Sequence, residues 1–198
     1  MAAPKILVIP GSLRTGSYNV MLAALAVKEL ALADVEVTRL SLEDYPLPLY
    51  DADEESRGGM PPAAGKLKQM MMAHHGVFIA CPEYNASVPP LLKNAIDWVS
   101  RVRERNEGAY AAFKGRAFAI SSASPNAFGG VRALLTLRQI LTLGCGALVI
   151  PEQVSIASAD HAFDERGNLA NTGLANQLRA QLERLTEMAQ SMMRREMA

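Results

Sequence analysis

The sequence predicts a three-layer, doubly wound α/β fold, in which helices cover both faces of one five-stranded parallel sheet. Short runs of β-branched and apolar residues alternate with longer helical patterns, from residues 6–9 to residues 147–150. These runs are apolar on both faces, as in parallel strands that are buried on both sides. No linker, internal repeat or low-complexity tract interrupts the 198 residues, so we expect a single domain over residues 1–198.

The first strand and the first helix begin this alternation. Residues 5–9 contain the run Ile-Leu-Val-Ile, which is typical of a buried strand. Ser17 is expected to cap a helix over residues 17–32, and a second strand follows near residues 35–40. Apolar residues surround most of that helix, and one stripe of them is Val20, Ala24, Val27 and Ala31.

The middle and the end of the chain repeat this unit. Pro89 and Pro90 suit the first turn of a helix near residues 88–102, because no intrahelical N–H is lost there. Its apolar stripe is Leu92, Ala95, Ile96 and Val99, and that of the last helix is Leu178, Leu182, Leu185, Ala189 and Met192. The remaining strands are expected near 76–81, 116–121 and 146–150, and the remaining helices near 61–74, 130–143 and 173–195.

Three stretches do not fit the alternation. Residues 44–62 are rich in Pro, Asp and Gly, and residues 101–113 are highly charged. Both are expected to run over the surface. Residues 151–173 mix small, polar and charged side chains before the last helix.

Composition and charge narrow the class of protein. Twenty Lys and Arg balance 20 Asp and Glu, so nucleic acid is not expected as a partner. Apolar stretches fall far short of the roughly 20 residues that span a bilayer, and no targeting segment is indicated. Cys81 and Cys145 lie far apart without further ligands at metal spacing. We therefore expect a soluble, cytoplasmic protein without a metal site.

Ligands of such folds bind outside the carboxyl ends of the strands, where the strand order reverses. After the first expected strand, residues 10–19 place hydroxyls, a guanidinium and an amide at the start of a helix, where backbone N–H groups favour a phosphate. The candidate donors are Ser12, Arg14, Ser17 and Asn19. A Ser-rich cap on an ordinary loop is the alternative.

Two nucleotide-binding motifs are absent from this loop. Gly11 and Gly16 have the spacing of a P-loop, but Ser17 and Tyr18 stand where that motif requires Lys and then Ser or Thr. There is no G-x-G-x-x-G sequence either. Hydrolysis of ATP or GTP is therefore disfavoured.

The loop after the third strand is a tight polar turn that runs into a helix. Pro82 and Asn85 restrict its backbone, Tyr84 offers an aromatic face and a hydroxyl, and Glu83 helps to order the loop. Such a turn suits a flat ring with heteroatoms at its edge. A hairpin-like turn with a surface tyrosine is the alternative.

The loop after the fourth strand is small and polar, from Ser121 to Arg132, and contains the pair Gly129-Gly130. It would let a ligand lie close to the backbone, although a flexible connector would look the same. Three such loops at one sheet edge are more specific than any one of them.

Together these residues resemble the NADPH-dependent FMN reductase family, a flavodoxin-like group that includes quinone, chromate and azo-dye reductases. The family's G-S-x-R-x-x-S-x-N motif matches residues 11–19, and its P-E-Y-N motif matches residues 82–85. L-K-N-A-I-D-W follows at residues 92–98, and Gly129-Gly130 precedes Leu-Arg-Gln at residues 137–139. The resemblance covers the first strand through the fifth.

The resemblance implies a flavodoxin-like sheet with strand order 2-1-3-4-5 and a noncovalent FMN. Hydride would pass from NADPH or NADH to FMN, and electrons then to a small acceptor such as a quinone, azo compound, ferric chelate or chromate, in a ping-pong cycle without a catalytic side chain. The implied cofactor contacts are Ser12, Arg14, Ser17, Tyr18 and Asn19; Pro82, Glu83, Tyr84 and Asn85; and Ser121, Ser122 and Ser124.

Two alternatives to this function stay open. A flavodoxin-type electron carrier would hold FMN without its own NAD(P)H turnover, but such carriers tend to be acidic and this chain is neutral. A phosphate-binding regulatory module without flavin would leave residues 82–85 unexplained.

Relatives in this family form dimers or tetramers, so a homodimer or homotetramer is expected. The helix that contains Trp98 and the helix from Val131 to Leu143 are the candidate contact surfaces. Arg101, Arg103 and Arg105 are hypothesised to receive the ribose phosphate of NADPH, with a solvated charged face as the alternative.

Overall fold

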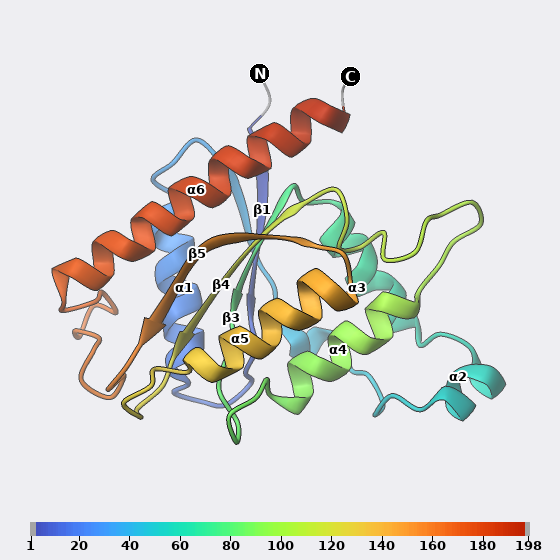
Figure 1. Cartoon of the computed structure of the whole chain (residues 1–198), viewed down its shortest axis with the longest axis horizontal. Coiled ribbons are helices and arrows are strands. Elements are labelled where there is room, and N and C mark those ends of the chain that lie inside the picture. Colours follow the sequence, from blue (N-terminus) through green and yellow to red (C-terminus); the bar gives the residue numbers. More distant parts are fainter. Residues whose placement is uncertain (1–2, 197–198) are drawn as a thin grey trace.

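A computed structural model describes residues 3–196 and shows five parallel strands in the order β2-β1-β3-β4-β5 (Figure 1). The expected strand order and fold are confirmed. The strands are β1 (Lys5–Pro10), β2 (Glu36–Arg39), β3 (Gly76–Ala80), β4 (Ala117–Ala123) and β5 (Leu148–Ile156). The longer helices are α1 (Tyr18–Leu30), α3 (Pro62–Met72), α4 (Pro90–Arg101), α5 (Val131–Gln139) and α6 (Thr172–Glu196).

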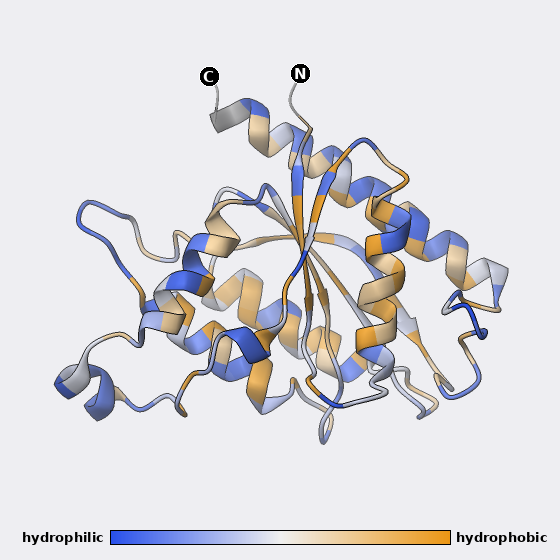
Figure 2. Ribbon diagram, turned by 180° about the vertical axis from the view of Figure 1, so that it is seen from behind, coloured by the Kyte–Doolittle hydropathy of each residue, from blue (hydrophilic) through white to orange (hydrophobic). Residues whose placement is uncertain are grey.

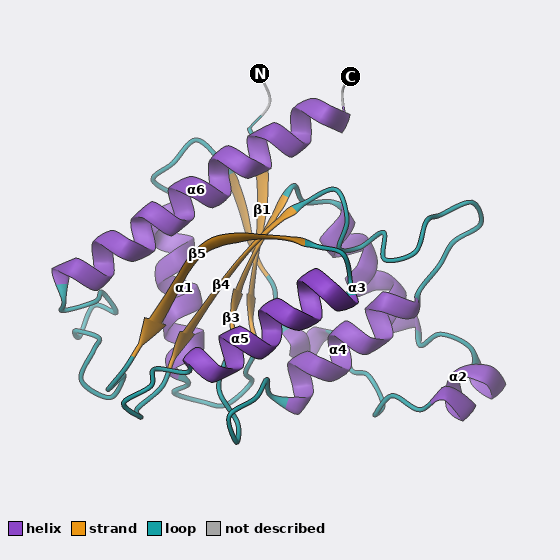
Figure 3. Ribbon diagram, viewed as in Figure 1, coloured by secondary structure: helices purple, strands orange, loops and turns teal. Residues whose placement is uncertain are grey.

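Helices form two layers around this sheet (Figure 3). α1 and α6 pack on one face, and α3, α4 and α5 pack on the other. Apolar stretches lie along the strands and on parts of the helices beside them (Figure 2). Register keeps like residues opposite each other: Ile9 pairs with Ile79, and Ile79 pairs with Ile120. Burial on both faces explains why the central strands are continuously apolar.

The helix stripes show where periodicity is informative. All the predicted stripe residues of α4 and α6 are buried. The stripe predicted for α1 is wrong, because Ala24 and Ala31 are exposed. Apolar residues surround α1 on most sides, so periodicity alone did not select its core face. The face that packs on the sheet contains Leu22, Ala23, Ala26 and Leu30.

The fifth strand extends beyond the predicted end at residue 150. It continues through Pro151 to Ile156 past a register shift opposite Phe118 and Ile120. Arg138 stabilises the irregular stretch, since its guanidinium donates to the carbonyls of Ile150 (2.9 Å) and Val149 (3.3 Å). Proline is tolerated in edge strands and at bulges, where no ladder N–H is needed.

The stretch expected as an irregular surface loop, residues 44–62, contains a short helix, α2 (Ala52–Gly58). The Asp51 carboxylate caps it by accepting from the amides of Asp53 (2.7 Å) and Glu54 (3.4 Å). A 3-10 turn, Leu42–Asp44, precedes this stretch, and a π-helical turn, Ile140–Gly144, follows α5.

Trp98 does not offer a contact surface to a second subunit. Its side chain is buried, and its indole N–H donates to the Pro48 carbonyl (2.7 Å). The Tyr50 ring covers it in an edge-to-face contact, with centroids 5.1 Å apart. The chain's own residues 48–50 therefore cover Trp98, and contact of α4 with a second subunit stays a prediction.

A buried ion pair anchors the charged loop between α4 and β4. Lys68 of α3 is buried, and its ammonium pairs with the Glu107 carboxylate and, at 3.7 Å, with Glu104. The end of that loop enters the core at Phe113.

Within the described part of the chain, no helix has the length and apolar composition needed to cross a membrane.

Candidate functional site

Three loops meet at the carboxyl edge of the sheet: the first loop (residues 11–17), the second loop (residues 81–89) and the third loop (residues 124–130). They lie together at the lower edge in Figure 1. Backbone bonds join the strand ends beneath them: the Gly11 amide donates to the Ala80 carbonyl (2.8 Å). The three loops that the sequence singled out therefore form one site.

The first loop presents an open helix N-terminus. Ser17 occupies the N-cap position, as expected, but its hydroxyl makes no capping hydrogen bond. The first intrahelical bonds run from the amides of Val20 and Met21 to the Ser17 carbonyl (3.0 Å each). The preceding helical amides therefore have no intrahelical acceptor, and such groups attract an anion.

Arg14 brings a positive charge to the same loop. Its guanidinium is exposed and donates to the carbonyls of Thr15 (3.2 Å) and Gly16 (3.3 Å). It also lies 5.9 Å from the centre of the Tyr18 ring. Ser12 is buried beneath it, and its hydroxyl accepts from the Arg14 amide (3.2 Å). The loop is thus held together by its own polar groups.

Asn19 and Ser121 use their side chains to build the floor of the site. The Asn19 amide exchanges two hydrogen bonds with the backbone of Ala123, at 2.8 and 3.0 Å. The Ser121 hydroxyl donates to Gln181 Oε1 (2.6 Å) inside the α6 layer. Direct contact of these two side chains with a cofactor stays a prediction, whereas their bonds fix the ends of α1 and β4.

The second loop is a two-residue hairpin turn. The backbones of Tyr84 and Ser87 exchange two hydrogen bonds of 3.0 Å. Asn85 and Ala86 between them have φ of 49° and 63°, so both sit in the left-handed region. The Tyr84 side chain is half exposed at the mouth of the site. The hairpin-like alternative describes the backbone correctly, and it leaves an aromatic face open to a ligand.

Glu83 locks the second loop to α5. Its carboxylate is buried and accepts from the Arg132 guanidinium (Nε, 2.9 Å) and from the Ala133 amide (3.4 Å). Burial alone would raise the pKa of Glu83, but these hydrogen bonds outweigh it, and the pKa lies below its ordinary value. Arg132 also lies 4.7 Å from the Phe128 ring centre. The residues around Arg132 in the sequence give no signal of this partner, so Arg132 was not among the predicted site residues.

The third loop brings backbone close to its neighbours. Gly129 and Gly130 have φ of 58° and 85°. A Cβ at Gly129 would lie 2.7 Å from the Ala157 amide nitrogen, and one at Gly130 would overlap the Ser122 hydroxyl. The Ser122 hydroxyl is buried and has no hydrogen-bond partner among the described residues. An unpaired buried hydroxyl costs about 1–3 kcal/mol, so it marks a place where a further polar group is expected.

Ser124 shapes the start of this loop. It is buried, its amide donates to the Ile156 carbonyl (2.9 Å), and its hydroxyl accepts from the Asn126 amide (3.4 Å). Pro82 of the second loop packs against Gly11 of the first, where an added Cβ would lie 3.1 Å from Pro82 Cδ. The loops thus approach one another through residues that are small or rigid.

Cys81 begins the second loop but is not a reactive group. Its thiol is buried, and burial raises the pKa of Cys81 well above its ordinary value. The thiol donates to the Pro82 carbonyl (3.3 Å). Packing accounts for this residue.

The arginines of residues 101–105 lie away from the site. α4 begins at the second loop, and its 12 residues carry the chain about 18 Å toward the opposite edge. Arg101 is paired there with Glu55 (2.5 Å), and the loop that holds Arg103 and Arg105 extends from the far end of α4 (Figure 1). The hypothesis that they receive the ribose phosphate stays a prediction, and their distance from the three loops does not favour it.

Known proteins resemble this chain over most of its length. The model of the NADPH-dependent FMN reductase family matches residues 4–161. An NAD(P)H-dependent FMN reductase of Pseudomonas aeruginosa is 37% identical over 182 residues, 91% of this chain and 92% of that protein. A quinone reductase of Escherichia coli is 35% identical over 189 residues, 94% and 95% of the two chains. The flavoenzyme NAD(P)H:(acceptor) oxidoreductase FerB from Paracoccus denitrificans superposes with a TM-score of 0.76 at 26% identity, covering 96% of this chain and 98% of FerB.

Proposed function

The chain belongs to the NADPH-dependent FMN reductase family, and from this premise we propose that it binds FMN noncovalently, oxidises NADPH or NADH and reduces a small acceptor. The observation that supports this function best is the convergence of three loops of different chemistry at one sheet edge. An anionic group suits the first loop, a flat ring the second, and a close backbone approach the third.

The residues present fit FMN. Arg14, the buried hydroxyls of Ser12 and Ser17, and the open amides of α1 suit its phosphate. The remaining proposed contacts are Tyr18 and Asn19 beside the phosphate, Pro82, Glu83, Tyr84 and Asn85 along the ring, and Ser121, Ser122 and Ser124 on the other side. The unpaired Ser122 hydroxyl and the positive φ of Gly130 support a ligand that lies close to this loop.

The protein's own part in the reaction is to bind and orient. When bound, FMN supplies hydride acceptance and onward electron transfer. The hairpin at Tyr84 and the Glu83–Arg132 ion pair hold the second loop in place, and no side chain at the site needs to donate a proton. We propose a ping-pong order, in which the nicotinamide leaves before a quinone, azo compound, ferric chelate or chromate takes its place.

Assembly, domain content and location belong to the same proposal. Leu13, Tyr84 and Phe128 are about half exposed on the three loops, and a second subunit in a homodimer or homotetramer would cover them. Residues 1–198 act as one FMN-binding domain in the cytoplasm, without nucleic acid or membrane as a partner.

One spectroscopic experiment tests this function. The protein purified with FMN is expected to show oxidised flavin bands that bleach when NADPH is added anaerobically and return when a quinone follows. Bound flavin that neither NADPH nor NADH bleaches would favour the electron carrier instead. Failure to retain FMN would remove the cofactor assignment.

A further inference from the structure

A cleft opens on the β2 side of the first loop. Its volume is about 440 Å³, and its walls come from the first loop, the first turn of α1, the end of β2 and the 3-10 turn Leu42–Asp44. No residue of the second or third loop lines it. The cleft is therefore a neighbour of the proposed flavin site and shares only the first loop with it.

Two arginines from separate elements line this cleft. Arg39 is the last residue of β2, paired with Val8 in the sheet, and Arg14 belongs to the first loop. Arg39 is exposed and makes no ion pair or side-chain hydrogen bond within the described residues. Arg14 is held by the carbonyls of Thr15 and Gly16 at the cleft wall. The Arg39 guanidinium therefore keeps its donors available for an anion.

The opposite wall of the cleft is acidic. Glu43 and Asp44 of the 3-10 turn are exposed and face the same space. A simple anion such as inorganic phosphate would be attracted by one wall and repelled by the other. A nucleotide carries an anionic phosphate together with hydroxyl and amino donors that carboxylates can accept. The mixed lining therefore favours a phosphorylated nucleoside over a free anion.

We propose that Arg39 is the main contact of a subsite for the 2′-phosphate of NADPH, next to the FMN phosphate site at Arg14, and makes the protein prefer NADPH to NADH. The proposal rests on the function proposed above. Dinucleotide-binding α/β proteins use an arginine beside the first β–α unit to accommodate this phosphate, and planar guanidiniums match phosphate oxygens. Arg39 stands at the carboxyl edge, beside the flavin site, where residues 101–105 do not.

Kinetics with paired substrates test the subsite. In the FMN-loaded protein, Arg39→Gln is expected to lower kcat/KM for NADPH about tenfold, the effect of one lost charge-assisted hydrogen bond, and to change the value for NADH less than about twofold. Arg39→Lys should retain part of the preference. Arg105→Gln is the matched control and should alter neither value. An equal fall for both nucleotides in Arg39→Gln, or no fall, overturns the proposal.

Binding without turnover separates this inference from the proposed function. By titration calorimetry, adenosine 2′,5′-bisphosphate should bind the FMN-loaded protein more tightly than AMP, inorganic phosphate should bind weakly, and Arg39→Gln should abolish the difference between the nucleotides. Equal binding of bisphosphate and AMP to the wild type overturns the subsite, as does a loss of FMN affinity in Arg39→Gln, which would assign the cleft to FMN. A protein that distinguishes the nucleotides but oxidises neither NADPH nor NADH would refute the proposed function alone.

Discussion

The two edges of the sheet differ in how one buried polar group at each is satisfied. At the amino edge, Lys68 is buried and paired with Glu107, so its charge is compensated within the chain. At the carboxyl edge, the Ser122 hydroxyl is buried without a partner among the described residues. An unpaired buried polar group costs stability and persists where it serves a site. The amino edge is built for stability, and the carboxyl edge for a ligand.

Removing the buried Lys68 side chain at the amino edge is expected to have the largest effect on stability. Lys68→Ala should lower the free energy of unfolding by about 3 kcal/mol, because a buried ion pair and a packed side-chain stem are lost together. Urea denaturation measures it. Lys68→Met, which keeps the volume, should cost less, and FMN affinity should not change in either variant.

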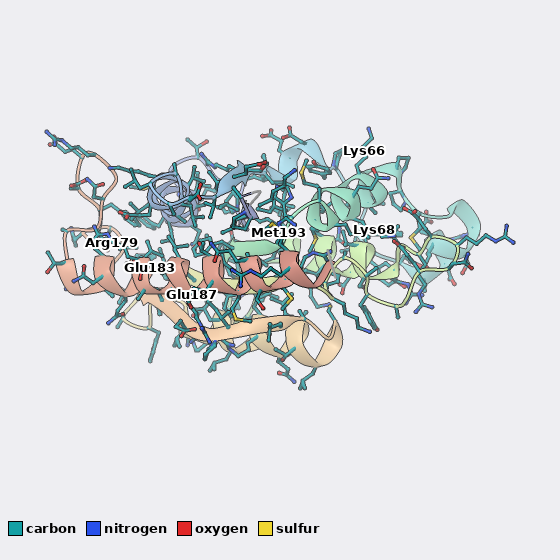
Figure 4. All side chains as sticks on the ribbon, turned by 90° about the horizontal axis from the view of Figure 1, so that it is seen from above. Lys66, Lys68, Arg179, Glu183, Glu187 and Met193 are labelled. Atoms are coloured by element: carbon teal, nitrogen blue, oxygen red, sulfur yellow. The ribbon has the colours of Figure 1, made fainter. Side chains whose placement is uncertain are left out.

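The control for this variant lies on the same helix. Lys66 is exposed on α3 (Figure 4), and Lys66→Ala should change stability by less than about 0.5 kcal/mol. Equal effects of the two alanine variants would show that the buried ion pair does not support the fold.

A side chain at Gly130 should destabilise the third loop at the carboxyl edge. Gly130→Ala places a Cβ against the Ser122 hydroxyl at a φ of 85°, so we expect a loss of about 2 kcal/mol in stability together with weaker FMN binding. Gly16 has a similar φ of 67°, but the space around an added Cβ is open there. Gly16→Ala therefore measures the cost of the backbone conformation without steric overlap. Denaturation and FMN titration of both variants separate strain from overlap. Equal losses would contradict the assignment of a crowded third loop.

Relieving strain in the hairpin should change stability in the opposite direction. Ala86→Gly should raise the free energy of unfolding by about 1 kcal/mol, because alanine at a φ of 63° is strained. The same substitution at Ala24, exposed within α1, should lower it by about 1 kcal/mol. Thermal or urea unfolding gives both signs. A loss at position 86 would mean that the turn is not strained.

The smallest expected effect is on pH dependence. The pKa of Glu83 is lowered in the folded protein, so its contribution to stability is complete above its unfolded pKa and is lost as the pH falls through the folded value. The wild type should therefore lose stability more steeply than Glu83→Gln as the pH falls below about 4.5. Denaturation at a series of acidic pH values measures the two slopes. Parallel curves would rule out the ion pair as the cause.

The helices whose core face was predicted correctly have apolar residues on one side and polar residues on the others. In α4, Leu92, Ala95 and Ile96 form a narrow apolar stripe against polar neighbours, so periodicity located the core face. In α1 such contrast is absent, and the predicted face was wrong. β5 was predicted too short because Pro151 resembles a strand end unless the partner at the bulge, Arg138, is known.

At the site, the sequence predicted the positions of the loops but not the partners of their side chains. The loop positions followed from strand order alone, since the carboxyl ends of parallel strands share an edge. Side-chain partners did not follow from the sequence. The bonds between Asn19 and Ala123, and between Ser121 and Gln181, join residues that are 104 and 60 positions apart in the sequence. The sequence shows the positive charge of the arginines in residues 101–105. It does not show that α4 carries them away from the three loops.

The two hydrogen bonds between Asn19 and Ala123 also bear on how the protein folds during synthesis. These residues are 104 positions apart, so the start of α1 cannot be joined to the end of β4 until the fourth strand has been synthesised and has entered the sheet. Closing so long a segment is entropically costly and slow compared with forming local helix. Competence to hold a ligand therefore arises late in folding, and a chain interrupted before residue 123 would have the sequence motif of the first loop without a working site.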